Sequence, residues 1–411
     1  MRRFLKNEIR GYVVVAERKW LRDGDCRRQT YYRALCMAFG IAVTVLAGTA
    51  VGNGAAKVNS MVGLTSPSTF TCSATGSSAT NQVPVTGAVA GGAVDDSTAI
   101  QKAINAAGAD GGGVVSLPAG TFMINSHLVM KNNVKLTGVG PSTVIKAGPN
   151  FLTSTGAGGG YPIISTMGAS DTTIANLTAD QSGNTLNANV ANRLDGYVVE
   201  GRSSTNVLIN DVTVIDPFTY SIAMVGVSKF CVENSTVNAS ATLHEYSQLD
   251  GIHIMSSTSG QVINNVIQSG DDGLAAHTLT GPVHNILFAN NNVYGGVGAS
   301  GLQFAVGAPS SIYDITVEDN DFHGSFIGIH TGYYGSTATG SVYNITMSNN
   351  YIYSLLYGAA SPAIQMGLAD QKGAIKDIAA SNTLLCNAGA IEVQSGTGNS
   401  LTGTAATAAC G

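Results

Sequence analysis

A short apolar pattern recurs from about residue 134 onward and constrains the fold more than any other feature. Each copy has a few β-branched or apolar residues followed by Asn or Asp, as in Val207-Leu208-Ile209-Asn210-Asp211. The nine central positions span 244 residues in eight steps, a mean of 30.5. They are Leu136, Ile174, Ile209, Val232, Ile263, Phe288, Val317, Met347 and Ala380. A period of about 20–50 residues is typical of solenoids and propellers.

The apolar runs are short and rich in Val, Ile, Thr and Asn, which excludes helical repeats. No Trp-Asp signature or four-strand blade pattern appears, so a propeller is excluded as well. The sequence therefore predicts an all-β, single-stranded parallel β-helix, whose strands stack from turn to turn at about 4.8 Å. Asn tolerates left-handed backbone at bends and forms stacked amide ladders. Asn290, Asn291, Asn292, Asn320, Asn349 and Asn350 are predicted to do so.

The open end of such a coil needs a cap, and a helix is predicted for it over residues 96–107. Asp95 and Asp96 offer N-cap oxygens. One helical face is apolar and carries Ala99, Ile100, Ala103, Ile104 and Ala107. We therefore expect the β-helix domain over residues 95–411, with its coils at about 110–400. Residues 57–94 are predicted to be a linker or N-terminal arm.

The first 56 residues resemble an export signal. Ten of the twenty basic residues lie in the first 33 positions, and the 19 residues from Ala34 to Gly52 are uncharged and mostly apolar or small. We expect a signal peptide cleaved after Ala50 or Ala56, or else an N-terminal anchor, since about 20 residues span a bilayer. The protein is expected to be secreted or periplasmic, with membrane contact confined to an uncleaved leader.

Charge and cysteine usage narrow the remaining possibilities. Without the first 50 residues, 10 basic residues face 21 acidic ones, which argues against nucleic-acid binding through phosphates. Cys386 and Cys410 are predicted to form a disulfide that closes the C-terminal segment. Cys231 lies in an alternating apolar run and is predicted to be buried and free. No Cys-x-x-Cys pair is present, so no zinc site is expected.

Three acids are candidates for the chemistry. Asp250 is separated from the adjacent pair Asp271 and Asp272 by about one short turn of the predicted coil. One turn moves a side chain by one rung, about 5 Å, so the three carboxyl groups are expected to converge. Crowding raises carboxyl pKa values, so one acid can stay protonated while the others activate water, as in glycoside hydrolysis. We expect Gly270 and Gly273 to bend a strand there. The acid and a water-holding carboxylate are expected about 6.5–9.5 Å apart.

Polar side chains near these acids are candidate substrate contacts. His253 and His277 fall beside the acids in sequence, and Glu245 and Tyr246 lie in a predicted loop at the cleft edge. His330 lies further along the coil. Packing within the fold is the alternative role for each of them. We predict that these five residues contact the substrate.

The segment from Asp95 to Ile104, followed by Gly-Gly-Val-Val-Ser-Leu-Pro-Ala-Gly-Thr-Phe, resembles the N-terminal cap of the pectate-lyase-like superfamily. That resemblance implies a right-handed parallel β-helix with a short N-terminal capping α-helix, acting on a polysaccharide. The acids resemble the polygalacturonase family of inverting glycoside hydrolases, which carry Asn-Thr-Asp-Gly and then Asp-Asp one turn later. The second resemblance implies that Asp271 is the general acid, while Asp250 and Asp272 hold the attacking water.

The polygalacturonase motifs are incomplete. Gln248-Leu249 replaces Asn-Thr, and Gly298-Ala299-Ser300-Gly301 lacks the His of Gly-His-Gly. Ile329-His330-Thr331 stands where the family has Arg-Ile-Lys, the basic pair that grips a galacturonate carboxylate. The absence of the basic pair and the acidic charge of the chain after residue 50 favour a neutral sugar or an uncommon exopolysaccharide as substrate. Polygalacturonate would fit only if a cation bridged its carboxylates to the protein.

Three functions are compatible with these residues. The first is an inverting glycoside hydrolase, which needs no cofactor. The second is a lyase or epimerase on a uronate polymer, with calcium on the acids and Arg193, Arg202, His253 or Tyr246 as the base. The mannuronan epimerases have a similar cap, but their Asp-Pro-His-Glu motif is absent. The third is a non-catalytic glycan-binding surface protein. The partner in each case is a polysaccharide or oligosaccharide, and no oligomeric state is indicated.

Overall fold

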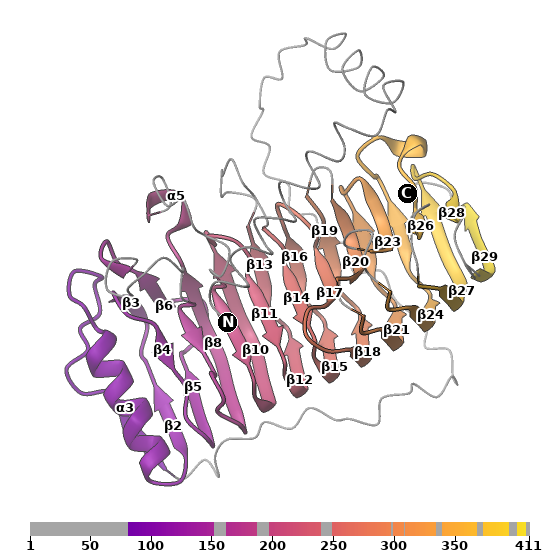
Figure 1. Ribbon diagram of the computed structural model, residues 1–411. Coiled ribbons are helices and arrows are strands. Elements are labelled where there is room, and N and C mark those ends of the chain that lie inside the picture. The colour runs from indigo at the N-terminus through magenta and orange to yellow at the C-terminus, as the bar shows by residue number, and fades with distance from the viewer. Residues whose placement is uncertain are drawn as a thin grey trace, which may run out of the picture. The chain divides into compact units, whose positions relative to one another are not determined.

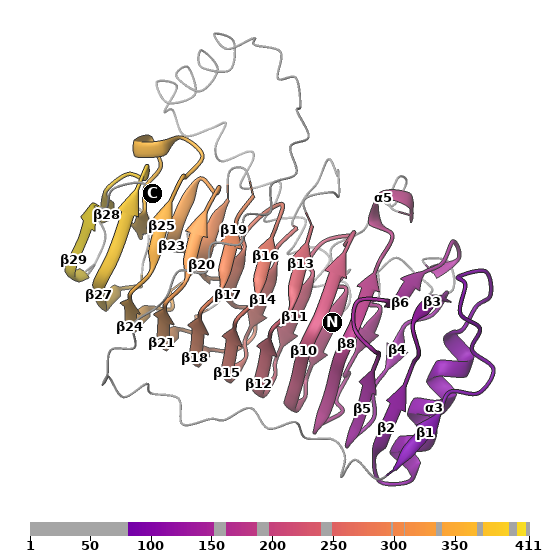
Figure 2. The same cartoon turned by 180° about the vertical axis from the view of Figure 1, so that it is seen from behind.

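The described part of the chain is a right-handed parallel β-helix (Figure 1). The computed structural model describes residues 81–151, 162–186, 197–239, 249–296, 299–307, 309–333, 339–367, 373–393 and 401–407. The paired strands in these ranges are parallel and follow one another along the coil, as the view from behind also shows (Figure 2). The fold expected from the repeat and the cap is confirmed.

Each turn of the coil contributes to two sheets. The ten-stranded sheet consists of β4 (Leu128–Val129), β7 (Ile164–Ser165), β9 (Val199–Arg202), β11 (Ile222–Val225), β14 (Ile252–Met255), β17 (Leu274–Thr278), β20 (Ser300–Val306), β23 (Ile327–Tyr333), β26 (Ile364–Met366) and β28 (Ile391–Val393). The 19-stranded sheet consists of β1 (Gln82–Pro84), β2 (Gly113–Ser116), β3 (Gly120–Ile124), β5 (Val134–Thr137), β6 (Thr143–Ala147), β8 (Thr172–Asp180), β10 (Thr205–Ile215), β12 (Ser228–Glu233), β13 (Thr236–Asn238), β15 (Thr258–Ile263), β16 (Val266–Gln268), β18 (Val283–Ala289), β19 (Asn292–Tyr294), β21 (Ile312–Glu318), β22 (Asp321–His323), β24 (Val342–Ser348), β25 (Tyr351–Tyr353), β27 (Ile375–Cys386) and β29 (Leu401–Thr407). In several turns the larger sheet holds two strands with a bend between them, so these turns have three strand segments.

The repeat positions form one buried column inside the coil. Eight of the nine predicted positions pair in register from turn to turn, and each belongs to the core. The exception is Ile263, because Val262 pairs with Val232 and with Phe288 instead. Successive strand residues face opposite sides, so a one-residue error in the pattern selects an outward residue. Ile263 is accordingly half-buried, whereas Val262 is in the core.

A ladder of buried asparagines crosses four successive turns and includes three of the six predicted residues, Asn291, Asn320 and Asn350, together with Asn265. The side-chain amide of Asn265 donates to Asn291 at 2.9 Å, Asn291 donates to Asn320 at 2.9 Å, and Asn320 donates to Asn350 at 3.0 Å. Each of the four residues is at most 1% exposed. The positions before them have positive φ at Asn264 (57°) and at Asn290, Asp319 and Asn349 (53–55°). Asn and Asp tolerate that conformation, so the same bend recurs in these four turns.

The predicted cap is the helix α3, Ser97–Ala109. Its buried face consists of Ser97, Ile100, Ala103, Ile104 and Ala107, close to the predicted apolar face. Asp95 accepts hydrogen bonds from the Ser97 backbone N–H at 3.0 Å and from Asn125 at 3.2 Å, which joins the helix start to the first turn. Two further short elements, α5 (Gly183–Leu186) and the 3₁₀ turn η1 (Gly358–Ala360), lie between strands. Among the helices in the described ranges, none is long and apolar enough to cross a bilayer.

One cysteine prediction is wrong. Cys231 is buried at 2% exposure, as predicted, but it is disulfide-bonded rather than free. The apolar run around it predicts burial equally well for a thiol and for a disulfide, so the pattern cannot separate the two states. Cys386 is also disulfide-bonded. Its predicted partner, Cys410, lies outside the described residues, so that pairing stays a prediction.

Candidate active site

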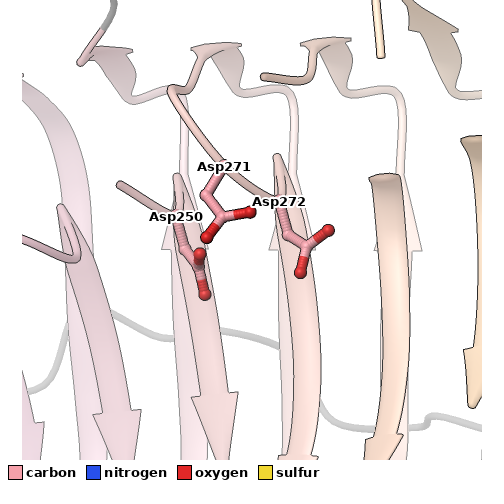
Figure 3. A group of neighbouring side chains, drawn as sticks. All are labelled: Asp250, Asp271 and Asp272. Atoms are coloured by element: carbon pink, nitrogen blue, oxygen red, sulfur yellow. The ribbon is translucent and has the colours of Figure 1, made fainter. Parts of the chain in front are cut away.

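The structure brings the three predicted acids together at one bend of the coil (Figure 3). Asp250 precedes β14 by two residues, and Asp272 precedes β17 by two residues. Because Ile252 of β14 pairs with Leu274 of β17, the two acids occupy the same position in adjacent turns. Asp271 lies on the bend between β16 and β17, and Figure 3 shows its carboxyl group between the other two. Oxygens of all three carboxyl groups lie within 4.8 Å of one another.

The predicted strand distortion is instead a turn between two strands. Residues 269–273 connect β16 to β17, so the alternation of side chains along a strand does not apply to Asp271 and Asp272. Gly273 keeps this bend close to the next turn, because a Cβ there would lie 2.1 Å from Val293 Cγ1. A Cβ on Gly270 would lie 2.7 Å from Leu249 Cδ1. The two glycines are therefore required by close packing.

The predicted gap of 6.5–9.5 Å between carboxyl groups is wrong for the closest oxygens, which lie within 4.8 Å. The cause is the coil itself. Asp250 lies one strand spacing from Asp272, about 4.8 Å, and Asp271 is the next residue on the same bend. The three carboxyl groups are therefore direct neighbours in space. A spacing of about 5 Å is the one expected for retention of configuration or for a cation site, so the geometry does not support inversion.

Burial and mutual repulsion favour the protonated forms of these acids. Burial raises the pKa of Asp250 to about 8, and burial together with the nearby Asp250 raises the pKa of Asp271 to about 8. The pKa of Asp272 is raised well above its usual value by burial and by both neighbouring acids. The backbone N–H of Ser300 donates to Asp272 at 2.7 Å, which opposes that rise. Asp271 is half-buried and is the most accessible of the three, so it is the best placed to meet a ligand.

Two of the predicted histidines lie beside the acids. His253 Nδ1 is 2.7 Å from an Asp250 carboxyl oxygen, but the direction of approach is not that of a hydrogen bond. Burial lowers the pKa of His253 to about 3, and burial with the neighbouring His253 lowers the pKa of His277 to about 3. The two rings stack at 5.6 Å, and Tyr220 meets His253 edge-on at 4.8 Å. Both imidazoles are therefore neutral near pH 7.

The other predicted contacts fall elsewhere. His330 lies in the same outward row as His253, on β23, and the row passes from His253 through Ala275 and Gln303 to His330. Three strand spacings, about 14 Å, therefore separate the two histidines. Glu245 and Tyr246 lie outside the described residues.

Sequence reasoning missed two tyrosines and one glutamate near the acids. Tyr197 and Tyr220 precede their core strands by two residues, as Asp250 does, so they occupy the equivalent position in the preceding turns. Their rings stack at 5.3 Å. The missed glutamate is Glu200, which forms a close ion pair on the same sheet with Arg202, a predicted candidate base, whose Nε lies 2.6 Å from a Glu200 oxygen. Aligning the turns on their core residues would have revealed the two tyrosines.

Residues 82–308, more than half of the chain, match the family model described as rhamnogalacturonase A/epimerase, pectate lyase-like. The chain belongs to this family. The superfamily predicted from the cap motif is therefore confirmed. The matched range includes the three acids and the two histidines beside them. The protein therefore has the parallel β-helix fold of the pectate-lyase-like superfamily.

The curated relatives of this rhamnogalacturonase A/epimerase family member include epimerases. Over 255 residues it is 29% identical to the mannuronan C5-epimerases AlgE1, AlgE2 and AlgE3 of Azotobacter vinelandii. The alignment covers 58% of this chain and between 13% and 24% of those proteins. The chain thus spans less than a quarter of the length of these relatives.

Solved structures of this fold include two polygalacturonases and an epimerase module. An exopolygalacturonase from Thermotoga maritima superposes with a TM-score of 0.63 at 16% identity, covering 76% of this chain and 88% of the other. A polygalacturonase from Erwinia carotovora gives 0.62 at 16% identity, covering 82% and 100%. The A-module of the mannuronan C5-epimerase AlgE6 from Azotobacter vinelandii gives 0.54 at 19% identity, covering 80% and 100%. At these identities the likeness concerns the fold.

The titration of this site predicts how the stability of the family member depends on pH. The acids with raised pKa values contribute stability that is complete below their ordinary pKa of 3.8 and is lost as pH rises through about 8. The histidines contribute stability that is complete above 6.5 and is lost as pH falls toward about 3. Between pH 6.5 and 8 the stability contributed by the histidines is constant while that of the acids decreases, so we expect the Tm to fall across that interval. Differential scanning fluorimetry checks this, and a flat or rising Tm would contradict the assignment.

Proposed function

We propose that this protein is a glycoside hydrolase that cleaves a polysaccharide, with Asp271 as the general acid. The observation that carries the proposal is the convergence of three carboxyl groups within 4.8 Å at an outward bend. The raised pKa of Asp271 keeps its proton available near neutral pH, and its partial exposure lets it reach a glycosidic oxygen. Asp250 and Asp272 are the groups that position water.

The described residues favour a neutral sugar at this site. Within the described strands of the ten-stranded sheet and the bend of the acids, Arg202 is the one Lys or Arg, and it is paired with Glu200. A uronate carboxylate placed beside Asp271 would meet further negative charge wherever the acids ionise. A neutral polysaccharide avoids that repulsion. A uronate polymer would require a bridging cation on the acids.

We also propose that the protein acts outside the cytoplasm. The basic leader followed by an apolar stretch within residues 1–56 supports export. The disulfides at Cys231 and Cys386 support it independently, because structural disulfides persist mainly in oxidising compartments.

A second candidate is a lyase or C5-epimerase on a uronate polymer. The 29% identity to mannuronan C5-epimerases favours it, and so does the position of His253 beside Asp250 at 2.7 Å. A neutral imidazole can accept the C5 proton of a uronate, since burial keeps His253 unprotonated. In that reaction the three acids would hold a cation such as calcium, which would neutralise the substrate carboxylate.

One screen separates these reactions. The full-length protein is incubated with a panel of neutral and uronate polysaccharides, with and without EDTA. Reducing ends, the ultraviolet absorbance of an unsaturated product, and the C5 configuration by NMR are then measured. We expect new reducing ends without unsaturation, unchanged by EDTA. An unsaturated product or inverted C5 centres, lost on chelation, would instead support the second candidate. Binding without any reaction would support a glycan-binding surface protein.

A further inference from the structure

Cys231 lies on the outside of the coil and is nevertheless buried. Its neighbours on β12, Phe230 and Val232, belong to the core, so strand alternation turns Cys231 outward. It is 2% exposed, and Leu208, which pairs with it on β10 and also lies outside the core cluster, is 5% exposed. An outward face this well covered requires another part of the chain to lie against it.

The two disulfide-bonded cysteines of the described residues cannot be bonded to each other. Cys231 is on β12 and Cys386 is on β27, and the register runs from one strand to the other in five steps. Five steps amount to about 24 Å. A disulfide needs Cα atoms within about 7 Å of each other. Each cysteine therefore has its partner outside the described residues.

The short stretch of chain between β29 and Cys410 makes Cys386 the disulfide partner of Cys410. Thr407 on β29 pairs with Leu385, which is the neighbour of Cys386. Cys410 is three residues further along, a distance of at most about 10 Å. From β29 to β12 there are six strand steps, about 29 Å, which three residues cannot span. Cys410 can therefore reach Cys386 but not Cys231.

The chain between Cys72 and β1 is long enough for Cys72 to bond to Cys231. The first described strand, β1, begins the same outward row in which Cys231 lies. That row passes through Gln82, Val114, Lys135, Thr173, Leu208 and Cys231 in five steps. The five steps amount to about 24 Å. Ten residues separate Cys72 from Gln82, and they can span about 33 Å.

We propose that Cys72 and Cys231 form a disulfide, which ties the chain before β1 to β12 of the 19-stranded sheet. The remaining cysteines, Cys26 and Cys36, lie in the predicted leader and would leave with it on cleavage. In forming the bond, the two thiols lose two protons and two electrons to the disulfide of a thiol oxidoreductase, which becomes a dithiol.

Peptide mapping without reduction tests the proposal. The full-length chain is produced in an oxidising compartment, its free thiols are alkylated, and it is digested with pepsin at acid pH, where disulfides do not exchange. We expect one linked peptide pair containing Cys72 and Cys231, and another containing Cys386 and Cys410. Alkylated Cys231, or Cys231 linked to Cys26, Cys36 or Cys410, would overturn the proposal.

Two serine variants separate the arm from the C-terminal bond. The Cys72→Ser variant should release Cys231 alone to the alkylating reagent, and its Tm should fall by about 10 °C, because a loop of about 160 residues is no longer closed. The Cys410→Ser variant should release Cys386 and leave Cys231 unreactive. If Cys72→Ser leaves Cys231 unreactive, the assigned pairing is wrong.

Discussion

Replacing Asp271 by Asn is expected to lower the rate of glycoside hydrolysis by about 100-fold or more. The amide keeps the shape of the side chain but carries no acidic proton, and general acid catalysis typically contributes about 100-fold to 10,000-fold. The substitution also removes one of three crowded carboxyl groups, so the fold should tolerate it. Initial rates of reducing-end formation on the polysaccharide identified by the screen provide the measurement.

The control for this variant is Asp319→Asn. Asp319 lies at the bend between β21 and β22, and its φ of 55° is close to the 53° of Asn290 and the 54° of Asn349 in the adjacent turns. The change therefore introduces the residue that the neighbouring turns already contain, and the rate should equal that of the parent. Hydrolysis by Asp271→Asn at the parent rate would remove Asp271 from the role of general acid.

Replacing Asn320 by Ala is expected to cause a large loss of stability. The Asn320 amide donates to Phe288 O at 2.9 Å and to Asn350 at 3.0 Å, and its carbonyl accepts from Asn291 at 2.9 Å. Removing it takes the shared acceptor from the backbone N–H and the side-chain amide of Asn291 and a donor from Phe288 O, and each buried polar group left unpaired costs about 1–3 kcal/mol. We expect the free energy of unfolding to fall by about 3–5 kcal/mol. Thermal unfolding followed by circular dichroism measures the change.

Asn105→Ala is the matching control, because Asn105 lies on the exposed face of α3, where Ala is the better helix former. Its unfolding curve should overlay that of the parent. If the Asn320→Ala variant has the Tm of the parent, the amide ladder does not stabilise the bends.

The coil could be predicted from the sequence because each turn repeats the same local chemistry. Apolar residues face inward at a nearly constant spacing, and Asn or Asp marks each bend, so the column and the ladder follow from the pattern. The acid cluster could be predicted for the same reason, since Asp250 and Asp272 are one turn apart in sequence and one strand apart in space.

The remaining features depend on contacts that no local pattern encodes. The distance between carboxyl groups depends on how tightly residues 269–273 turn, and packing of Gly273 against Val293 determines that. The state of Cys231 depends on a residue far away in the chain, whereas the run around it encodes only burial. The position of Tyr220 beside His253 becomes visible once the exact register of the turns is known.

The stacking of turns along one axis affects how the acid site forms and how it is lost. Each turn contacts mainly the turns before and after it, so local stability behaves like a one-dimensional chain of coupled units. Asp250 and Asp272 belong to consecutive units, and four strands of the ten-stranded sheet, β20, β23, β26 and β28, follow them in the described chain. Fraying from the C-terminal end must therefore pass through those later units before it reaches the acids. During synthesis from the N-terminus, the acids can come together before the last turns have left the ribosome.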